Sequence, residues 1–290
     1  MKEQLDTRPS AIAGQWYSSD SRVLAGEVDR YINKAKTPEL DGEVLAVVAP
    51  HAGHQYSGQV AGHAFAILKG LTPEVVVVVS PMHQPYYEKL LTTGHAAYET
   101  PLGIIPVEKK ALMELSASLE KTSGIRITPI SRDSEHSLEI ELPFLQRALG
   151  KPFRILPVMV RDQSAQVAQA LGSGLADLFR GSGALAGSRP LLVASTDLSH
   201  FYTQSQANAL DQKMLDAIQS FDPEQVIRLD ESGQGFACGR GAVAAVLWAS
   251  KALGADKVHI LDYATSGDVS GDYSSVVGYG SAAVTRKKDH

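Results

Sequence analysis

The sequence predicts an α/β fold in which a central mixed, largely parallel sheet is flanked by helices on both faces. Several short runs rich in Val, Ile and Leu are bounded by Pro, Gly or polar residues, a pattern typical of strands that are buried on both sides. Segments with helical periodicity alternate with these runs. The chain has 290 residues of which 44% are hydrophobic, which is enough for one large core, so a single domain over residues 1–290 is expected.

Six strands and seven helices carry this prediction. The expected strands are Val44–Pro50, Glu74–Ser80, Phe153–Val160, Pro190–Thr196, Lys257–Tyr263 and a final strand, Ser275–Val284. The expected helices are Val23–Ala35, Gln59–Lys69, Glu108–Leu119, Glu135–Leu149, Ala165–Phe179, Ser205–Ser220 and Ala242–Leu253. Pro143 is expected to kink or end the helix that contains it, because proline removes a backbone donor.

Composition excludes several classes of partner. The formal net charge is −5 and no block of Lys or Arg interrupts the apolar segments, so no nucleic-acid partner is expected. The polar stretch from Met1 to Ser10 does not resemble a secretory signal, and the longest apolar run, Val75–Val79, is too short to span a bilayer. We therefore expect a cytoplasmic protein with no membrane partner.

Three of the expected strands are followed directly by histidine-containing segments. His51 and His54 follow the first strand, His83 follows the second, and Asp197 and His200 follow the strand that ends at Thr196. In open α/β sheets, ligands bind outside the carboxyl ends of the strands. A lone histidine at such a place is more often a cap or a turn residue, but three such segments together indicate metal binding or proton transfer.

Cys238, the only cysteine, lies between glycines and before a predicted helix. The positive end of the helix dipole, with Arg240 nearby, is expected to favour the thiolate, which is the form that binds metal. The alternative is a small buried residue that packs under the helix. The flanking glycines favour a site, since they let the backbone approach another group closely.

The segment from Asp133 to Glu139 opens a helix with an apolar face. Ser134 is a candidate N-cap, and His136 would lie in the first turn, pointing toward solvent or toward the cleft. These residues are either capping and packing residues, or His136 contacts a substrate or orients a ligand.

Taken in order, these residues resemble the Memo family, whose prokaryotic members are called AmmeMemoRadiSam system protein B. The resemblance covers nearly the whole chain. Its landmarks are Ala13-Gly14-Gln15-Trp16-Tyr17, Ala49-Pro50-His51-Ala52-Gly53, Ser80-Pro81-Met82-His83, Glu135-His136-Ser137-Leu138-Glu139, Leu142-Pro143, Ser195-Thr196-Asp197-Leu198-Ser199-His200 and Cys238-Gly239-Arg240.

The resemblance implies a fold similar to that of the class III extradiol dioxygenases, which use non-haem Fe(II) and O₂. It implies a metal held by His51, His83 and Cys238, where Cys238 replaces the carboxylate of those enzymes. Fe(II) is the expected metal, and the softer sulfur ligand also suits Cu or Zn.

The remaining roles follow from the same resemblance. His200 is implied as the general acid or base, accompanied by Asp197, and His54 and His136 would line the substrate pocket. A small aromatic or oxygen-bearing substrate and a radical-SAM protein partner are also implied.

Three functions stay open at this point. The first is a metal-dependent, dioxygenase-like oxidoreductase, and the second is a non-catalytic module that binds a metal or a partner on the same scaffold. The third is a metal-free hydrolase that uses Cys238 with His200.

Overall fold

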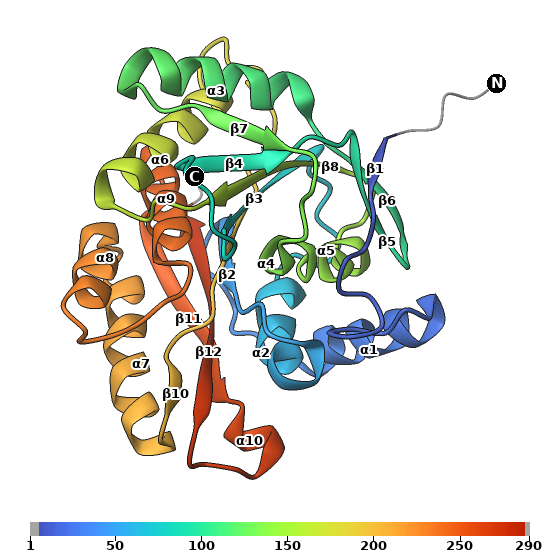
Figure 1. The fold of residues 1–290 in the computed structure, drawn as a ribbon, viewed down its shortest axis with the longest axis vertical. Helices are drawn as coiled ribbons and strands as arrows, with labels where there is room; N and C mark the ends of the chain where they lie inside the picture. The colour runs from blue at the N-terminus through green and yellow to red at the C-terminus, as the bar shows by residue number, and fades with distance from the viewer. Residues whose placement is uncertain (1–5, 288–290) are drawn as a thin grey trace.

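The computed structural model describes residues 6–287, which form a layered α/β structure (Figure 1). The strands of the larger sheet are β2 (Glu43–Ala49), β3 (Val75–Pro81), β4 (Leu90–Thr93), β7 (Ile127–Ile130), β8 (Arg154–Val160), β9 (Leu192–Ser195), β10 (His200–Tyr202), β11 (Lys257–Thr265) and β12 (Val276–Arg286). Their order is β10-β12-β2-β9-β3-β8-β4-β7, and β11 pairs with β12. A smaller sheet has the order β1-β5-β6, formed by β1 (Thr7–Arg8), β5 (Ala97–Thr100) and β6 (Gly103–Pro106).

The four central strands, β2, β9, β3 and β8, are mutually parallel, and antiparallel pairings adjoin them on both sides. Every residue of Val75–Pro81 is buried. A continuous apolar run of this kind suits a strand whose two faces are both covered. The predicted mixed α/β sheet is confirmed, with its parallel part at the centre.

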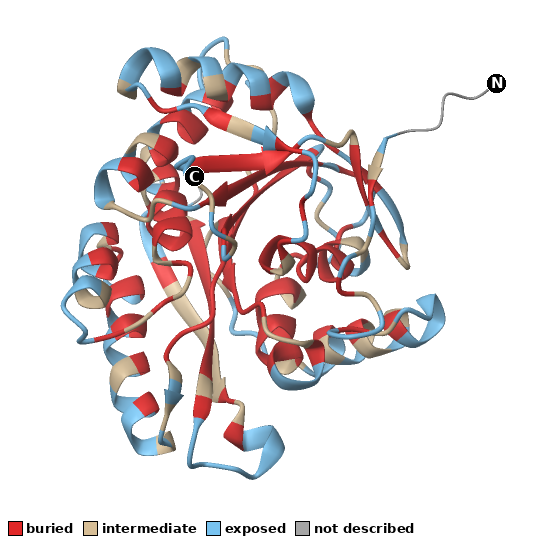
Figure 2. Ribbon diagram, in the orientation of Figure 1, coloured by how far each residue is buried: buried red, intermediate tan, exposed pale blue. Residues whose placement is uncertain are grey.

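Helices cover both faces of the sheet. They are α1 (Ser21–Lys34), α2 (His54–Ala66), α3 (Lys109–Ser123), α4 (His136–Glu139), α5 (Leu142–Ala148), α6 (Ala165–Phe179), α7 (Gln204–Gln219), α8 (Pro223–Glu231), α9 (Arg240–Ala252) and α10 (Gly267–Ser270). In Figure 1, α3, α6, α7, α8 and α9 lie on one side of the sheet, and α1, α2, α4 and α5 lie on the other. Figure 2 shows that buried residues fill the sheet and the helix faces turned toward it. None of the helices within residues 6–287 has both the length and the apolar character needed to cross a membrane.

The predicted helix Glu135–Leu149 is two helices in the structure. Helix α4 ends at Glu139, and α5 begins at Leu142 with Pro143 in its first turn, where a missing backbone N–H costs nothing. Glu135, rather than the expected Ser134, caps α4, because its side chain accepts a hydrogen bond from the N–H of Ser137. The sequence analysis also missed α8 and the short strands β1, β4, β5, β6, β7 and β10.

A buried ion cluster attaches the N-terminal segment to α4. Arg8 is fully buried, its Nε lies 2.9 Å from Asp133 Oδ2, and its Nη1 donates to Glu139. Glu139 also accepts a hydrogen bond of 2.6 Å from the hydroxyl of Tyr17. Because Glu139 ends the short helix that begins with His136, this cluster fixes the position of that histidine.

We expect Arg8→Met to destabilise the protein by about 3–5 kcal/mol, because the substitution leaves two buried carboxylates without their cation. Urea denaturation followed by circular dichroism measures this loss. The matched control is Arg126→Met, whose partner Glu120 is exposed, and its effect should stay within about 0.5 kcal/mol. A loss below about 1 kcal/mol for Arg8→Met would show that the cluster does not anchor the segment.

Candidate metal centre

The histidine-containing segments meet at one edge of the sheet. His51 follows β2, His83 follows β3, and the segment from Asp197 to His200 follows β9. Strands β2, β9 and β3 are parallel neighbours, so their carboxyl ends lie side by side. The structure therefore brings together the residues that the sequence analysis grouped.

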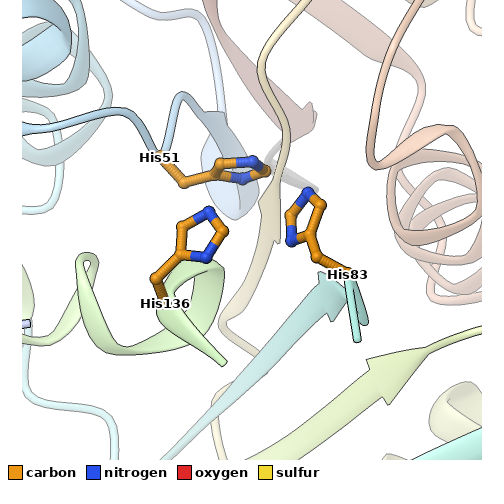
Figure 3. A group of neighbouring side chains, drawn as sticks. All are labelled: His51, His83 and His136. Atoms are coloured by element: carbon orange, nitrogen blue, oxygen red, sulfur yellow. The ribbon is translucent and has the colours of Figure 1, made fainter. Parts of the chain in front are cut away.

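Three imidazoles converge at this edge: His51, His83 and His136 (Figure 3). One ring nitrogen from each lies within 4.8 Å of the others. The ring centroids are 5.3 Å apart for His51 and His83, 5.5 Å for His51 and His136, and 4.6 Å for His83 and His136. Neutral imidazole is a common ligand of Fe, Cu and Zn, so the donor set is suited to a divalent transition metal.

The second nitrogen of each ring is held by a neighbouring acceptor. Nδ1 of His83 and Nδ1 of His136 lie 2.9 Å and 3.2 Å from Oε1 of Glu135. Nδ1 of His51 lies 2.9 Å from Oγ of Ser195, whose hydroxyl donates to the carbonyl of Ser137. Nδ1 of His51 and Nδ1 of His83 therefore donate, which leaves the Nε2 lone pair of these two rings for a ligand. This is the arrangement that orients metal-binding histidines, and it fits the metal that the family resemblance implies.

Burial and hydrogen bonding set the protonation of this group. Burial would raise the pKa of Glu135, but the hydrogen bond and charge of His83, the charge of His136 and the N–H of Ser137 hold it well below its ordinary value. Burial lowers the pKa of His136 to about 4, although Glu135 opposes the shift. Burial, with His136 and His83 nearby, also lowers the pKa of His51. Burial thus favours the neutral form of His51 and His136, which is the form that binds a cation.

Cys238 lies beside His51. Its Sγ is 3.1 Å from Nε2 of His51 and accepts a hydrogen bond of 3.2 Å from the N–H of Asp197. Cys238 does not belong to the group of three ring nitrogens, and it does not line the cleft. Of the expected ligands, the structure thus places His51 and His83 with His136, and Cys238 beside Nε2 of His51.

The expected thiolate is not favoured in the metal-free protein. Burial and the nearby Asp197 raise the pKa of Cys238 well above its ordinary value. Cys238 does lie before helix α9, but the Nη1 of Arg240 is 2.7 Å from Asp230, so this cation is already paired. Desolvation outweighs the helix dipole here.

Asp197 contacts His51 and not the ring of His200. Its Oδ1 accepts a hydrogen bond of 2.8 Å from the N–H of His51, and burial raises its pKa to about 7. The ring of His200 is held instead by the carbonyl of Leu198, 2.8 Å from Nδ1. Nε2 of His200 is therefore the nitrogen left for a ligand.

A cleft of about 1100 Å³ opens above these residues. Its lining includes the side chains of five histidines: His51, His54, His83, His136 and His200. His54 is 3% exposed, and its Nε2 lies 3.2 Å from the carbonyl of Ile140. The cleft is large enough for a small organic ligand that touches the imidazole group.

Comparison with known proteins gives the family. The family model described as Memo-like protein matches residues 8–283. This chain belongs to the Memo family. The resemblance found in the sequence is confirmed over almost the whole chain.

Archaeal relatives of this Memo-family chain match along their full length. A MEMO1 family protein of Nitrosopumilus maritimus is 34% identical over 277 residues, which is 94% of this chain and 98% of the relative. Another, from Methanopyrus kandleri, is 35% identical and covers 96% of this chain and 99% of its own length. A third, from Methanosarcina mazei, is 35% identical and covers 97% and 100%.

Among solved structures, an uncharacterized protein of Escherichia coli K12, JW3007, aligns with a TM-score of 0.47 at 14% identity. The alignment covers 83% of the Memo-family chain and 99% of that protein. An overlap this loose carries no argument about the site.

The sequence analysis missed two residues that orient the histidines, Glu135 and Ser195. Both lie inside the landmark segments, one residue before His136 and two before Asp197. The only signal available was their position beside residues already singled out. Their roles depend on contacts between segments that are 52 and 144 residues apart.

Buried His54 makes the protein sensitive to acid. Burial lowers its pKa to about 4, whereas in the unfolded chain an imidazole binds its proton below about pH 6.5. The unfolded state therefore takes up this proton first, and stability is lost as the pH falls from about 6.5 to about 4, by about 3 kcal/mol.

Thermal melts of the metal-free protein between pH 7.5 and 4.5 test this. We expect His54→Phe, whose ring can pack on Phe144, to lose less stability toward acid than the unmodified protein. Tyr87→Phe, at a fully exposed position, should leave the acid dependence unchanged. If the melting temperatures of His54→Phe and of the unmodified protein fell equally with pH, the acid dependence would belong to other groups.

Proposed function

We propose that this protein binds one redox-capable divalent metal ion at the edge of the sheet and that it is a non-haem, dioxygenase-like oxidoreductase. The observation that carries the proposal is the convergence of three imidazoles at the floor of a cleft, each with its Nδ1 within 3.2 Å of a hydroxyl or carboxylate oxygen. One ring nitrogen from each histidine lies within 4.8 Å of the others, as the ligands of one shared cation would.

His51 and His83 are the two ligands that both the resemblance and the geometry support. The third is either His136, which completes the group of ring nitrogens, or Cys238, whose sulfur lies 3.1 Å from Nε2 of His51. The two choices differ in chemistry. A third imidazole gives a neutral site, whereas a thiolate brings a negative charge and a softer donor.

The proposed metal is Fe(II), with Cu or Zn as the other candidates that suit imidazole and sulfur ligands. When bound, such a metal supplies a Lewis acid and, for Fe or Cu, a centre for one-electron chemistry with O₂. His200, oriented by the carbonyl of Leu198, would exchange protons with the substrate through Nε2. Asp197 would help to position His51, because its carboxylate accepts a hydrogen bond from the backbone N–H of His51.

A second candidate is a module that binds a metal or a partner protein without turnover. The observation that favours it is the donor set, since no carboxylate belongs to the group of three ring nitrogens in the described chain. Oxygen-activating Fe(II) sites commonly use two histidines and one carboxylate. The partner proposed from the family resemblance is a radical-SAM protein.

Single substitutions of the ligands test the metal site. We expect His51→Ala and His83→Ala each to weaken metal binding by more than about 100-fold, because each removes a direct bond. Metal content after purification without added metal, and anaerobic titration with Fe(II), give the measurement. His63→Ala, outside the cleft, serves as control.

The same titration with His136→Ala and Cys238→Ala identifies the third ligand. It is the residue whose substitution weakens Fe(II) binding more. Metal content that is unchanged in both His51→Ala and His83→Ala would contradict the proposed function.

Oxygen uptake separates the two candidates. The Fe(II)-loaded protein is expected to consume O₂ with at least one member of a panel of catechols. His200→Gln should lower that rate by about 100-fold or more while it retains the metal, because it removes a proton-transfer group and not a ligand. No uptake across the panel by protein that holds its Fe(II) would favour the binding module.

A further inference from the structure

The cleft has an aromatic wall that the proposed metal site does not use. Trp16, Tyr56 and Phe201 line it, and each is at least 36% exposed. The ring of Trp16 lies 4.4 Å from the ring of His136, and the ring of Phe201 lies 5.6 Å from that of His200. The wall therefore begins at the imidazole group and continues outward. Exposed aromatic rings inside a cleft are typical of sites that bind flat or cationic ligands.

The charged residues that line the cleft all carry carboxylates. They are Asp197 at the floor, Glu27 on α1 and Asp272 after α10, and no Lys or Arg within the described part of the chain lines it. Asp272 accepts hydrogen bonds from Ser274 alone, and neither it nor Glu27 forms an ion pair in residues 6–287. Away from the proposed metal, beside Glu27 and Asp272, an anionic ligand would meet like charge, whereas a cation would find two carboxylates without an ion pair in the described chain.

A hydrogen-bond acceptor without a partner among residues 6–287, Nδ1 of His54, also favours a ligand that carries an N–H or O–H donor. His54 is 3% exposed, and its Nε2 donates to the carbonyl of Ile140. This leaves Nδ1 as an acceptor, and Nδ1 is buried without a partner in the described structure. Leaving a buried polar atom unsatisfied has a cost, and an N–H or O–H donor that reached Nδ1 from the cleft that His54 lines would relieve it.

We propose that the cleft selects small aromatic molecules that carry a protonated amine and rejects those that carry a carboxylate or a phosphate. The aromatic wall holds the ring and attracts the cation, while Glu27 and Asp272 bind the ammonium group. This inference names the substrate class of the proposed function and rests on it. It concerns a different part of the cleft from the ligand nitrogens.

Three probes of equal size test the charge preference: 2-phenylethylammonium, 2-phenylethanol and phenylacetate. None has the paired ring hydroxyls of a catechol, and chelation removes any metal that the carboxylate or the amine could bind directly. Calorimetric titration of the full chain at pH 7.5, both as purified and after chelation, should give about tenfold tighter binding of the amine than of phenylacetate. The alcohol should lie between them, and salt should reduce the difference.

The double variant Glu27→Gln with Asp272→Asn tests the source of the preference. It should reduce the preference to about threefold or less without weakening the binding of 2-phenylethanol. Glu120→Gln removes a carboxylate that is not part of the cleft and should keep the full preference.

Three results would overturn the inference: phenylacetate binds as tightly as the amine, the double variant keeps the preference, or the amine shows no binding at 10 millimolar. Failure of the metal titrations alone would leave the amine preference intact, and failure of these probes alone would leave metal binding intact. The two proposals are therefore tested separately.

Discussion

One buried carboxylate oxygen holds two of the three converging rings. Oε1 of Glu135 accepts a hydrogen bond from Nδ1 of His83 and lies 3.2 Å from Nδ1 of His136, and Oε2 accepts from the backbone N–H of His83 at 2.7 Å. Glu135 is only 2% exposed, and a buried charge is costly unless it is compensated. Hydrogen bonds from the ring and the backbone of His83 and from the N–H of Ser137 supply part of that compensation. A cation bound at the opposite nitrogens of the same rings would supply more, so the carboxylate and the metal would stabilise one another.

Two parts of the fold position the residues of this site: the central sheet and the short helix α4. The parallel strands β2 and β3 lie on either side of β9, end at the same edge of the sheet, and present His51 and His83. Glu135 and His136 come from the start of α4, a helix of only four residues. Its position depends on Glu139, which binds the buried Arg8 and the N-terminal segment. The site therefore depends both on the sheet and on a buried ion cluster formed between distant segments.

The sequence predicts the residues at the strand ends well and the position of α4 poorly. Continuous apolar runs mark the central strands, and the position of His51 and His83 directly after them is enough to place both at one edge of the sheet. The inclusion of His136 among the converging nitrogens follows from the packing of α4, which no local pattern reveals. Strands of four residues or fewer, such as β4 and β10, are too short for a periodicity to be recognised.

The protonation of Cys238 was predicted wrongly for a related reason. The helix terminus and Arg240 are visible in the sequence, but the pairing of Arg240 with Asp230 and the burial of the sulfur are not. The ligand roles of His51, His83 and Cys238 stay predictions.

X-ray absorption at the metal edge, on protein loaded with one equivalent of Fe(II) without oxygen, tests the central claim most directly. The account predicts multiple scattering from at least two imidazole rings. A sulfur neighbour at about 2.3 Å would identify Cys238 as the third ligand, and additional imidazole scattering would identify His136. A spectrum with only oxygen neighbours and no imidazole scattering would contradict the claim that His51 and His83 bind the metal.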